Sequence, residues 1–245
     1  LGRGVTGITG IILAGGQSRR MGWPKALLPW AGPGPPIGFR TARHSSSSRR
    51  AGGAGGTMID AVVARLQPVV DDILIVAKSA TPFVGRGVRV VLDEIPDPHP
   101  FSGLVTGLRQ AAHEVSFVCA CDMPYLDGAL ISYLAGQLAG YDAVVPVGLQ
   151  GLDPLHAVYA RHCLDPLRRA WQAGERRLHG LLASLHLRLV RSPEPSDVAG
   201  WEASFVNVNT PATYRRSRRP SLRAVVDERH DVHHSPVHDV EAPSP

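Results

Sequence analysis

No apolar run in the sequence reaches the roughly 18 residues that a membrane-spanning helix needs. The run at residues 8–13 is far shorter and lacks the charged and small-residue flanks of a secretion signal. Cysteine is scarce, with three residues that lack the CxxC spacing of redox or zinc sites. Cys119 and Cys121 share one face of a predicted strand, where we expect small buried core residues. Nothing favours an oxidising compartment, so a cytoplasmic protein without membrane contact is expected.

The length, hydrophobic content and charge of the chain indicate how many domains it contains. The chain has 245 residues, of which 44% are hydrophobic, enough for one sizeable core. Its net charge of +5 suits a phosphorylated substrate and suits nucleic acid equally well. Much of that charge lies in two low-complexity segments, residues 33–57 and 215–245. We therefore expect one domain over residues 1–214 with a disordered loop insertion, followed by a solvated, disordered tail rich in basic residues, His and Pro.

Apolar residues alternate between strand-like and helix-like spacing along the domain. Strands are expected at residues 8–13, 73–76, 88–92, 115–121, 143–145, 156–160, 187–190 and 205–208. Helices are expected at residues 58–66, 104–112, 129–138, 163–172 and 177–184. This alternation predicts an α/β fold with a mostly parallel sheet, whose functional residues are expected at the carboxyl ends of the strands.

A glycine-rich loop follows the first predicted strand and reads LAGGQSRRMGWPK over residues 13–25. It fits neither the Walker A motif nor the GxGxxG dinucleotide fingerprint. Nevertheless, Gly15 and Gly16 let backbone amides approach an anion and permit positive φ. Arg19, Arg20 and Lys25 add positive charge for charge-assisted contacts. The loop is therefore predicted to bind phosphate.

Two acidic residues stand where predicted strands end. Asp122 closes the strand at residues 115–121, and a carboxylate there is costly unless it binds something. Because Mg²⁺ that carries substrate phosphates takes one or two carboxylates, Asp122 is the predicted metal ligand. The alternative is that Asp122 caps the next helix, but Asp127 is the better candidate for that role. Asp93 has the same strand-end position and is a second candidate.

These features together resemble the MobA-type molybdenum cofactor guanylyltransferases. The loop at residues 13–25 is similar to that family's signature, and CDMPYL at residues 121–126 resembles its metal-binding segment. AGERR at residues 173–177 and FVNVNTP at residues 205–211 are similar to later blocks. The resemblance covers residues 6–214 without the insertion, and it implies a three-layer αβα Rossmann-like nucleotidyltransferase fold.

The resemblance also implies a reaction. The terminal phosphate of molybdopterin attacks the α-phosphorus of Mg-GTP, which gives the guanine dinucleotide cofactor and pyrophosphate. The implied partners are GTP, molybdopterin and proteins that make or accept the cofactor, whereas nucleic acid is not expected. The implied roles are nucleotide contacts by Leu13, Ala14, Gly15 and Gly16, phosphate and catalytic roles for Lys25 and Arg19, a nucleoside contact by Asp93, Mg²⁺ and nucleotide binding by Asp122, and pterin contacts by Asn207 and Asn209.

Alternatives remain open at this point. A molybdopterin cytidylyltransferase and a sugar-1-phosphate nucleotidyltransferase are related enzymes, although the pair Gly15-Gly16 favours the guanylyl type. A nucleotide-binding partner protein without turnover is a third possibility, which retention of both Lys25 and Asp122 disfavours. Two segments depart from the family pattern: the strand at residues 73–76 ends in Val76, where some relatives place a polar nucleotide contact, and residues 153–156 are left unassigned.

Overall fold

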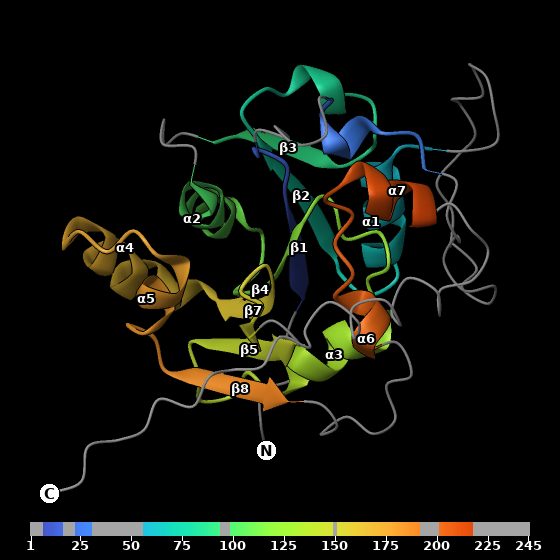
Figure 1. The fold of residues 1–245 in the computed structure, drawn as a ribbon. Coiled ribbons are helices and arrows are strands. Elements are labelled where there is room, and N and C mark those ends of the chain that lie inside the picture. The colour runs from blue at the N-terminus through green and yellow to red at the C-terminus, as the bar shows by residue number, and fades with distance from the viewer. Residues whose placement is uncertain are drawn as a thin grey trace, which may run out of the picture.

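A computed structural model describes residues 7–16, 23–30, 56–93, 99–148, 151–191 and 201–217. It has an eight-stranded sheet flanked by helices on both faces (Figure 1). The strands are β1 (Ile8–Leu13), β2 (Asp72–Ala77), β3 (Arg89–Leu92), β4 (Val115–Ala120), β5 (Ala143–Gly148), β6 (Gly151–Leu152), β7 (His156–Ala160) and β8 (Leu187–Arg191). The helices are α1 (Met58–Leu66), α2 (Pro100–Gln110), α3 (Gly128–Gly136), α4 (Leu164–Gln172), α5 (Leu178–Leu182), α6 (Trp201–Ser204) and α7 (Pro211–Ser217).

The sheet combines a parallel half with a mixed half. Its strand order is β3-β2-β1-β4-β7-β5-β6, and β8 pairs with β5. Strands β3, β2, β1 and β4 are mutually parallel, whereas β7 runs antiparallel to both β4 and β5. Strand β8 is parallel to β5. The predicted α/β fold with a mostly parallel sheet is thereby confirmed.

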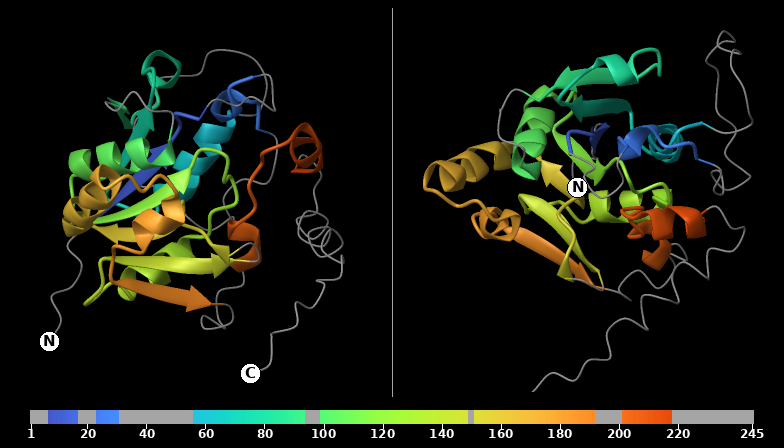
Figure 2. Two further views of the ribbon diagram at one scale, coloured as in Figure 1. Left: turned by 60° about the vertical axis from the view of Figure 1, so that its left-hand side comes forward. Right: turned by 45° about the horizontal axis from the view of Figure 1, so that its top comes forward.

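Helices cover the two faces of the sheet and give two apolar layers. Side chains of α1 and α3, including Val62 and Leu134, pack against one face. Side chains of α2, α4 and α5, including Leu104, Leu167 and Leu181, pack against the other. Figure 1 and the right-hand view of Figure 2 show these two groups of helices on opposite sides of the strands. The arrangement is the predicted three-layer αβα fold.

One predicted strand is wrong. Residues 205–208 form no strand, and the two short helices α6 and α7 on either side of them were not predicted. The alternation of Val206 and Val208 reflects burial instead, because both side chains pack in a small cluster with Trp30 and Tyr125. Among the described residues, Val208 donates its backbone N–H to the Asp122 carbonyl at 2.8 Å, which fixes this segment beside the end of β4.

The ends of the predicted insertion and tail are ordered. Thr57, predicted to belong to the insertion, precedes α1 and forms a bridge with Pro29. The Asp60 carboxylate accepts from the backbone and the hydroxyl of Thr57 at 2.8 and 2.6 Å. Residues on both sides of positions 31–55 are therefore held together, and residues 31–55 lie outside the described part of the chain. Likewise, residues 215–217 belong to α7, so the predicted domain boundary at Tyr214 falls inside a helix.

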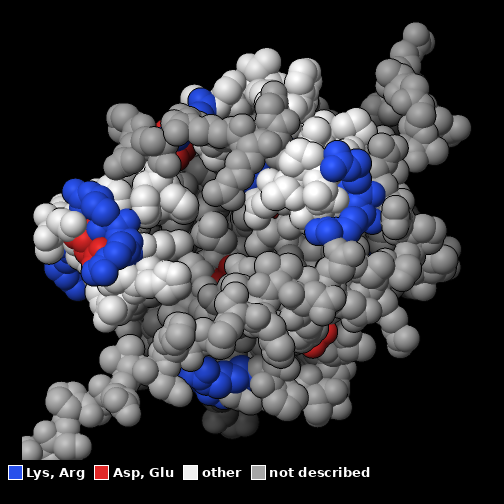
Figure 3. Space-filling view, viewed as in Figure 1, with Lys and Arg blue, Asp and Glu red and all other residues white. Residues whose placement is uncertain are grey.

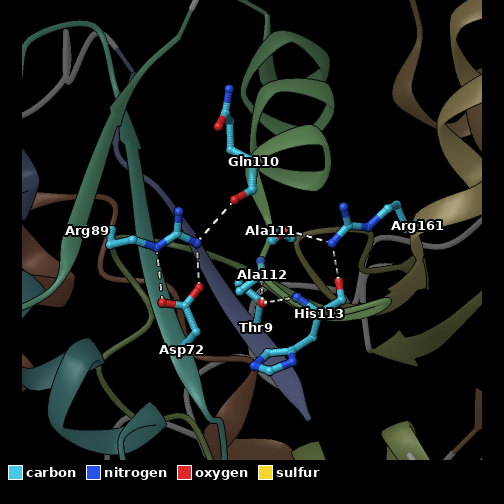
Figure 4. A network of polar contacts seen from close by, with 8 residues as sticks. All are labelled: Thr9, Asp72, Arg89, Gln110, Ala111, Ala112, His113 and Arg161. Carbon is cyan, nitrogen blue, oxygen red and sulfur yellow. Dashed lines mark hydrogen bonds and ion pairs between the residues drawn. The ribbon is translucent and has the colours of Figure 1, made fainter. Parts of the chain in front are cut away.

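Polar side chains fix the end of α2 to the amino ends of the strands (Figure 4). Arg89 donates to Asp72 at 3.1 Å and to the Gln110 carbonyl at 3.1 Å. Arg161 donates to the Ala111 carbonyl at 2.6 Å. These contacts satisfy carbonyls that the last turn of a helix leaves without intrahelical partners. The edge of the sheet that they stabilise is opposite to the edge where β1 to β4 end.

The close approach of α2 to β1 yields a prediction about stability. A Cβ atom on Gly107 would lie 2.5 Å from Cγ2 of Ile11, so Gly107→Ala forces the helix away from the strand. We expect this overpacking to lower the free energy of unfolding by about 1–3 kcal/mol in urea denaturation. Gly136→Ala in α3 is the matched control, because a Cβ there meets nothing within 4 Å. The control should be unchanged or slightly more stable, and equal losses in both variants would contradict this packing.

Candidate active site

The parallel half of the sheet gathers its carboxyl ends at one edge. Strands β1, β2, β3 and β4 run in the same direction, so the residues after them lie side by side. In open α/β sheets this edge is where ligands bind. The residues that directly follow these four strands are Ala14, Lys78, Asp93 and Cys121. Three of the predicted site residues, Ala14, Asp93 and Asp122, therefore lie at or next to this edge.

A lysine joins two predicted site residues from distant parts of the chain. Lys25 begins the 3₁₀-helix η1 (Lys25–Leu27), and its ammonium lies 3.2 Å from Oδ2 of Asp122. The same ammonium donates to Oδ1 of Asn209. The Asp122 side chain is only 10% exposed, so its charge is largely removed from water and the ion pair offsets that cost. The structure thus brings together Lys25, Asp122 and Asn209, which the sequence analysis selected separately.

Asn207 lies one residue before the backbone contact to Asp122. Its carboxamide oxygen is buried and has no hydrogen-bond partner among the described residues. A buried acceptor without a partner costs free energy, and a ligand that donates to it would remove that cost. Asn207 therefore has the environment expected of a residue that receives a donor group from a ligand.

A second lysine–carboxylate pair lies across β1 from the first. Lys78 Nζ lies 2.9 Å from Oδ2 of Asp93, whose side chain is 4% exposed. The hydroxyl of Ser102 donates to the same oxygen at 2.6 Å, and Thr106 donates to Oδ1 at 3.3 Å. Ser102 and Thr106 stand four residues apart on α2 and so share one face of that helix. The carboxylate of Asp93 is thus held by three described donors from two elements.

The glycines of the loop do not use the positive φ that glycine permits. Neither Gly15 nor Gly16 has positive φ in this structure. A Cβ on Gly15 would lie 3.7 Å from Cγ of Lys78, an ordinary contact, and a Cβ on Gly16 would meet nothing within 4 Å. Packing among the described residues does not require glycine at either position. The open space beyond Gly16 is consistent with close approach of a ligand to the backbone.

Three further residues considered in the sequence lie in different surroundings. Leu13 ends β1, and its carbonyl accepts from the Cys121 N–H at 3.1 Å. Asp127 caps α3, as predicted, by accepting from the N–H groups of Ala129 and Leu130. Burial raises the pKa of the Cys121 thiol to about 12, so this thiol is neutral near pH 7 and does not act as a thiolate. Arg19, together with the rest of residues 17–22, lies outside the described residues.

The block at residues 173–177 forms the turn between α4 and α5. Gly174 has φ of +97°, and Glu175 accepts from the backbone N–H groups of Arg176 and Arg177. The Arg177 side chain lowers the pKa of Glu175 to about 2. Arg176 lies over the ring of Trp171 with 4.1 Å from Cζ to the ring centroid. No described contact joins this turn to Lys25 or Asp122.

Exposed and half-buried arginines gather elsewhere on the molecule. Figure 3 shows one group of Lys and Arg side chains over α4 and α5 and another over α7. The first group comprises Arg168, Arg169, Arg176 and Arg177, and the second comprises Arg215 and Arg216. Lys25 and Lys78 differ from these arginines because each forms an ion pair with a buried carboxylate.

Lys78, Ser102 and Thr106 were missed by sequence reasoning. Lys78 directly follows the apolar run of β2, so the strand-end rule that selected Asp93 and Asp122 also applies to it. It was overlooked because the strand was predicted to end one residue early. Ser102 and Thr106 are small polar residues in a largely apolar helix, and only their contact with Asp93 distinguishes them from neutral helix residues.

Buried His156, in the segment left unassigned, connects the sheet to α6. Its Nε2 lies 2.9 Å from the hydroxyl of Ser204, which in turn accepts from the Asp127 N–H. Phe117 and Phe205 pack against the ring edge to face. This burial lowers the pKa of His156 to about 3. The ring is therefore neutral near pH 7 and serves as a structural contact between the sheet and the segment that carries Asn207.

The α/β fold and the match to a family model together identify a nucleotidyltransferase. The chain belongs to the family of MobA-like NTP transferase domains, which matches residues 10–191. It is 33% identical over 204 residues to a molybdenum cofactor guanylyltransferase of Desulfosudis oleivorans, covering 83% of this chain and 90% of that protein. It is 33% identical over 210 residues to a probable molybdenum cofactor guanylyltransferase of Pelotomaculum thermopropionicum, covering 86% and 91%.

A solved structure supports the fold. The molybdopterin-guanine dinucleotide biosynthesis protein A of Archaeoglobus fulgidus superposes with a TM-score of 0.66 at 23% identity, covering 86% of this chain and 96% of that chain. Among the described residues, no helix has the length and apolar character that crossing a membrane requires. The described residues also contain no group of three or more His, Cys, Asp or Glu side chains placed to hold a metal.

The buried neutral histidine predicts a pH dependence of stability. Because the pKa of His156 falls from 6.5 to about 3 on folding, the unfolded chain binds more protons between these values. The free energy of unfolding should therefore decrease as pH falls below about 6.5, by up to roughly 1.4 kcal/mol per pH unit from this group.

Denaturant titrations of His156→Gln between pH 7 and pH 5 should show a flatter dependence than the native chain. His179→Gln, at an exposed position on α5, is the matched control and should keep the native slope. If the free energy of unfolding of His156→Gln depends on pH as steeply as that of the native chain, His156 is not the cause of the pH dependence.

Proposed function

We propose that the protein transfers GMP from Mg-GTP to the terminal phosphate of molybdopterin and releases pyrophosphate. The observation that carries the proposal is the cluster of Lys25, Asp122 and Asn209 at the carboxyl edge of parallel strands. Its context is a MobA-like NTP transferase domain whose curated relatives are named molybdenum cofactor guanylyltransferases. We further expect the reaction to take place in the cytoplasm.

The chemistry needs charge neutralisation and alignment more than covalent catalysis. A phosphate oxygen of molybdopterin attacks the α-phosphorus of GTP, and the bond from that phosphorus to the bridging oxygen of pyrophosphate breaks. Negative charge develops on oxygens around the α-phosphorus, where a fixed ammonium stabilises it. Lys25 supplies this ammonium, and its contacts with Asp122 and Asn209 restrict its position. Arg19 is proposed to add charge to the same phosphates.

Mg²⁺ fits the residues at this site. The ion prefers oxygen ligands and commonly takes one or two carboxylates together with substrate phosphates. Asp122 offers such a carboxylate at a strand end, and its side chain is only 10% exposed. We propose that Asp122 holds Mg²⁺, which when bound would draw charge from the triphosphate. Lys25 would then exchange part of its contact with Asp122 for the phosphates.

The two substrates are proposed to lie on different sides of Lys25. Leu13, Ala14, Gly15 and Gly16 follow β1 and would contact GTP through their backbone. Asp93 follows β3, two strands from β1, and is proposed to belong to the nucleoside half of the site. Asn207 and Asn209 stand on the other side, beside Asp122, and are proposed to bind the pterin. The unpartnered carboxamide oxygen of Asn207 suits an N–H donor such as those of a pterin ring.

Nucleotide-dependent pyrophosphate release tests the reaction. Purified protein with Mg²⁺ should release pyrophosphate from GTP in the presence of molybdopterin, and should release little from CTP, ATP or UTP. Omission of molybdopterin should stop the release, because the acceptor phosphate is then missing. Consumption of CTP in place of GTP would instead identify a cytidylyltransferase, and nucleotide binding without release would identify a protein that does not turn over.

A variant of the nearby acid Asp127 distinguishes the metal role of Asp122 from a general loss of stability. Asp122→Ala should abolish transfer at saturating Mg²⁺, because it removes the proposed metal ligand and the carboxylate that contacts Lys25. Asp127→Ala is the matched control: it removes the cap of α3, at a cost of about 0.5–2 kcal/mol of stability, and should retain transfer. Undiminished activity in Asp122→Ala would remove the metal role.

A further inference from the structure

The pair formed by Lys78 and Asp93 presents its lysine, and not its carboxylate, to a ligand. The Asp93 side chain is 4% exposed, whereas 35% of the Lys78 side chain is exposed. Both oxygens of the carboxylate already accept hydrogen bonds from described donors. A ligand at this edge of the sheet therefore meets the ammonium of Lys78, and Asp93 acts through it.

The Asp93 carboxylate that holds this ammonium is itself fixed from several sides. Asp93 donates its backbone N–H to the Ala77 carbonyl at 2.8 Å, so the two strand ends are locked together. Ser102 and Thr106 hold the carboxylate from α2. A lysine side chain is otherwise flexible and loses conformational entropy when it is held in one place. Because the protein already restricts the Lys78 side chain, a contact with a ligand costs less conformational entropy than it would for a mobile lysine.

Lys78 lies across β1 from the ion pair of Lys25 and Asp122. It follows β2, and two strand spacings, about 10 Å, separate β2 from β4, which leads to Asp122. Gly15 lies two residues after β1, the strand between them, and a Cβ there would lie 3.7 Å from Cγ of Lys78. A nucleotide with its α-phosphate at Lys25 and Asp122 and its ribose over Gly15 would extend its base toward Lys78.

We propose that Lys78 donates a hydrogen bond to the O6 carbonyl of guanine and so selects GTP; this inference rests on the proposed function. An ammonium carries only donors, and guanine presents two adjacent acceptors, O6 and N7. Adenine carries an amino group in place of O6, which would direct its own donors at the ammonium. Asp93 and Ser102 are positioning residues that hold Lys78 at the required place.

The contact can be tested by removing the acceptor and the donor separately. The triphosphate of 2-aminopurine riboside lacks O6, whereas inosine triphosphate keeps it. The native protein should bind GTP more tightly than the 2-aminopurine nucleotide by about 10- to 100-fold, measured as Kd by calorimetry. Lys78→Met should weaken the binding of GTP and of inosine triphosphate by a similar factor. It should leave the Kd of the 2-aminopurine nucleotide nearly unchanged, so the preference for GTP over that nucleotide is lost.

Controls address folding and positioning. Because Lys78→Met leaves the Asp93 carboxylate without its ion-pair partner, the double variant Lys78→Met/Asp93→Asn removes both charges and should show the same loss of preference. Ser102→Ala should reduce the preference for GTP over the 2-aminopurine nucleotide by less than Lys78→Met does. Ser132→Ala, at an exposed serine on α3 that donates to the Gly128 carbonyl, should leave it unchanged.

Two outcomes separate this inference from the proposed transfer. If Lys78→Met weakens the binding of GTP and of the 2-aminopurine nucleotide equally, Lys78 contacts phosphate and the proposed contact with the base is overturned. The proposed transfer reaction is not affected by that outcome. If the native protein shows the preference, loses it in Lys78→Met and yet releases no pyrophosphate with molybdopterin present, the base assignment stands and the proposed transfer is wrong.

Discussion

The parallel pairing of β1 with β2 and with β4 is the constraint on which the candidate site depends. Parallel neighbours need long crossover connections, so segments far apart in the sequence end at the same edge. Lys78, Asp93 and Asp122 become neighbours of the glycine-rich loop for this reason alone. The helices that make the crossovers bury the sheet on both faces, which leaves the strand ends as the place for polar residues.

Each of the two buried carboxylates at this edge is paired with a lysine. Asp122 lies beside Lys25 and Asp93 beside Lys78, and both acids are at most 10% exposed. Charges in such surroundings are costly unless they are paired and hydrogen bonded. The two pairs differ in what surrounds the acid. Asp93 is enclosed by donors from α2, whereas Asp122 stands beside the segment that carries Asn207 and Asn209. We infer that one pair positions its lysine and that the other exchanges contacts when substrates bind.

Helix α2 links the two edges of the sheet. Its first turns supply Ser102 and Thr106 to the Asp93 carboxylate, and its last carbonyls accept from Arg89 and Arg161 at the opposite edge. Gly107 in its middle allows the helix to lie close to β1. The helix is thus held at both ends and in the centre, which explains how a short side chain such as Ser102 can fix Asp93, the residue that follows β3.

The amino-acid sequence predicted the class of fold, most elements and several candidate site residues, because apolar periodicity, strand-end acids and the loop at residues 13–25 are local patterns. It failed at residues 205–208, where alternating burial against Trp30 and Tyr125 imitates a strand. It also missed Lys78 and could not assign His156. Other features appear only in the folded chain: Lys25 contacts Asp122 and Asn209, and Asp93 is enclosed while Lys78 is exposed. These facts depend on contacts between residues up to 184 positions apart, and no local pattern encodes such distances.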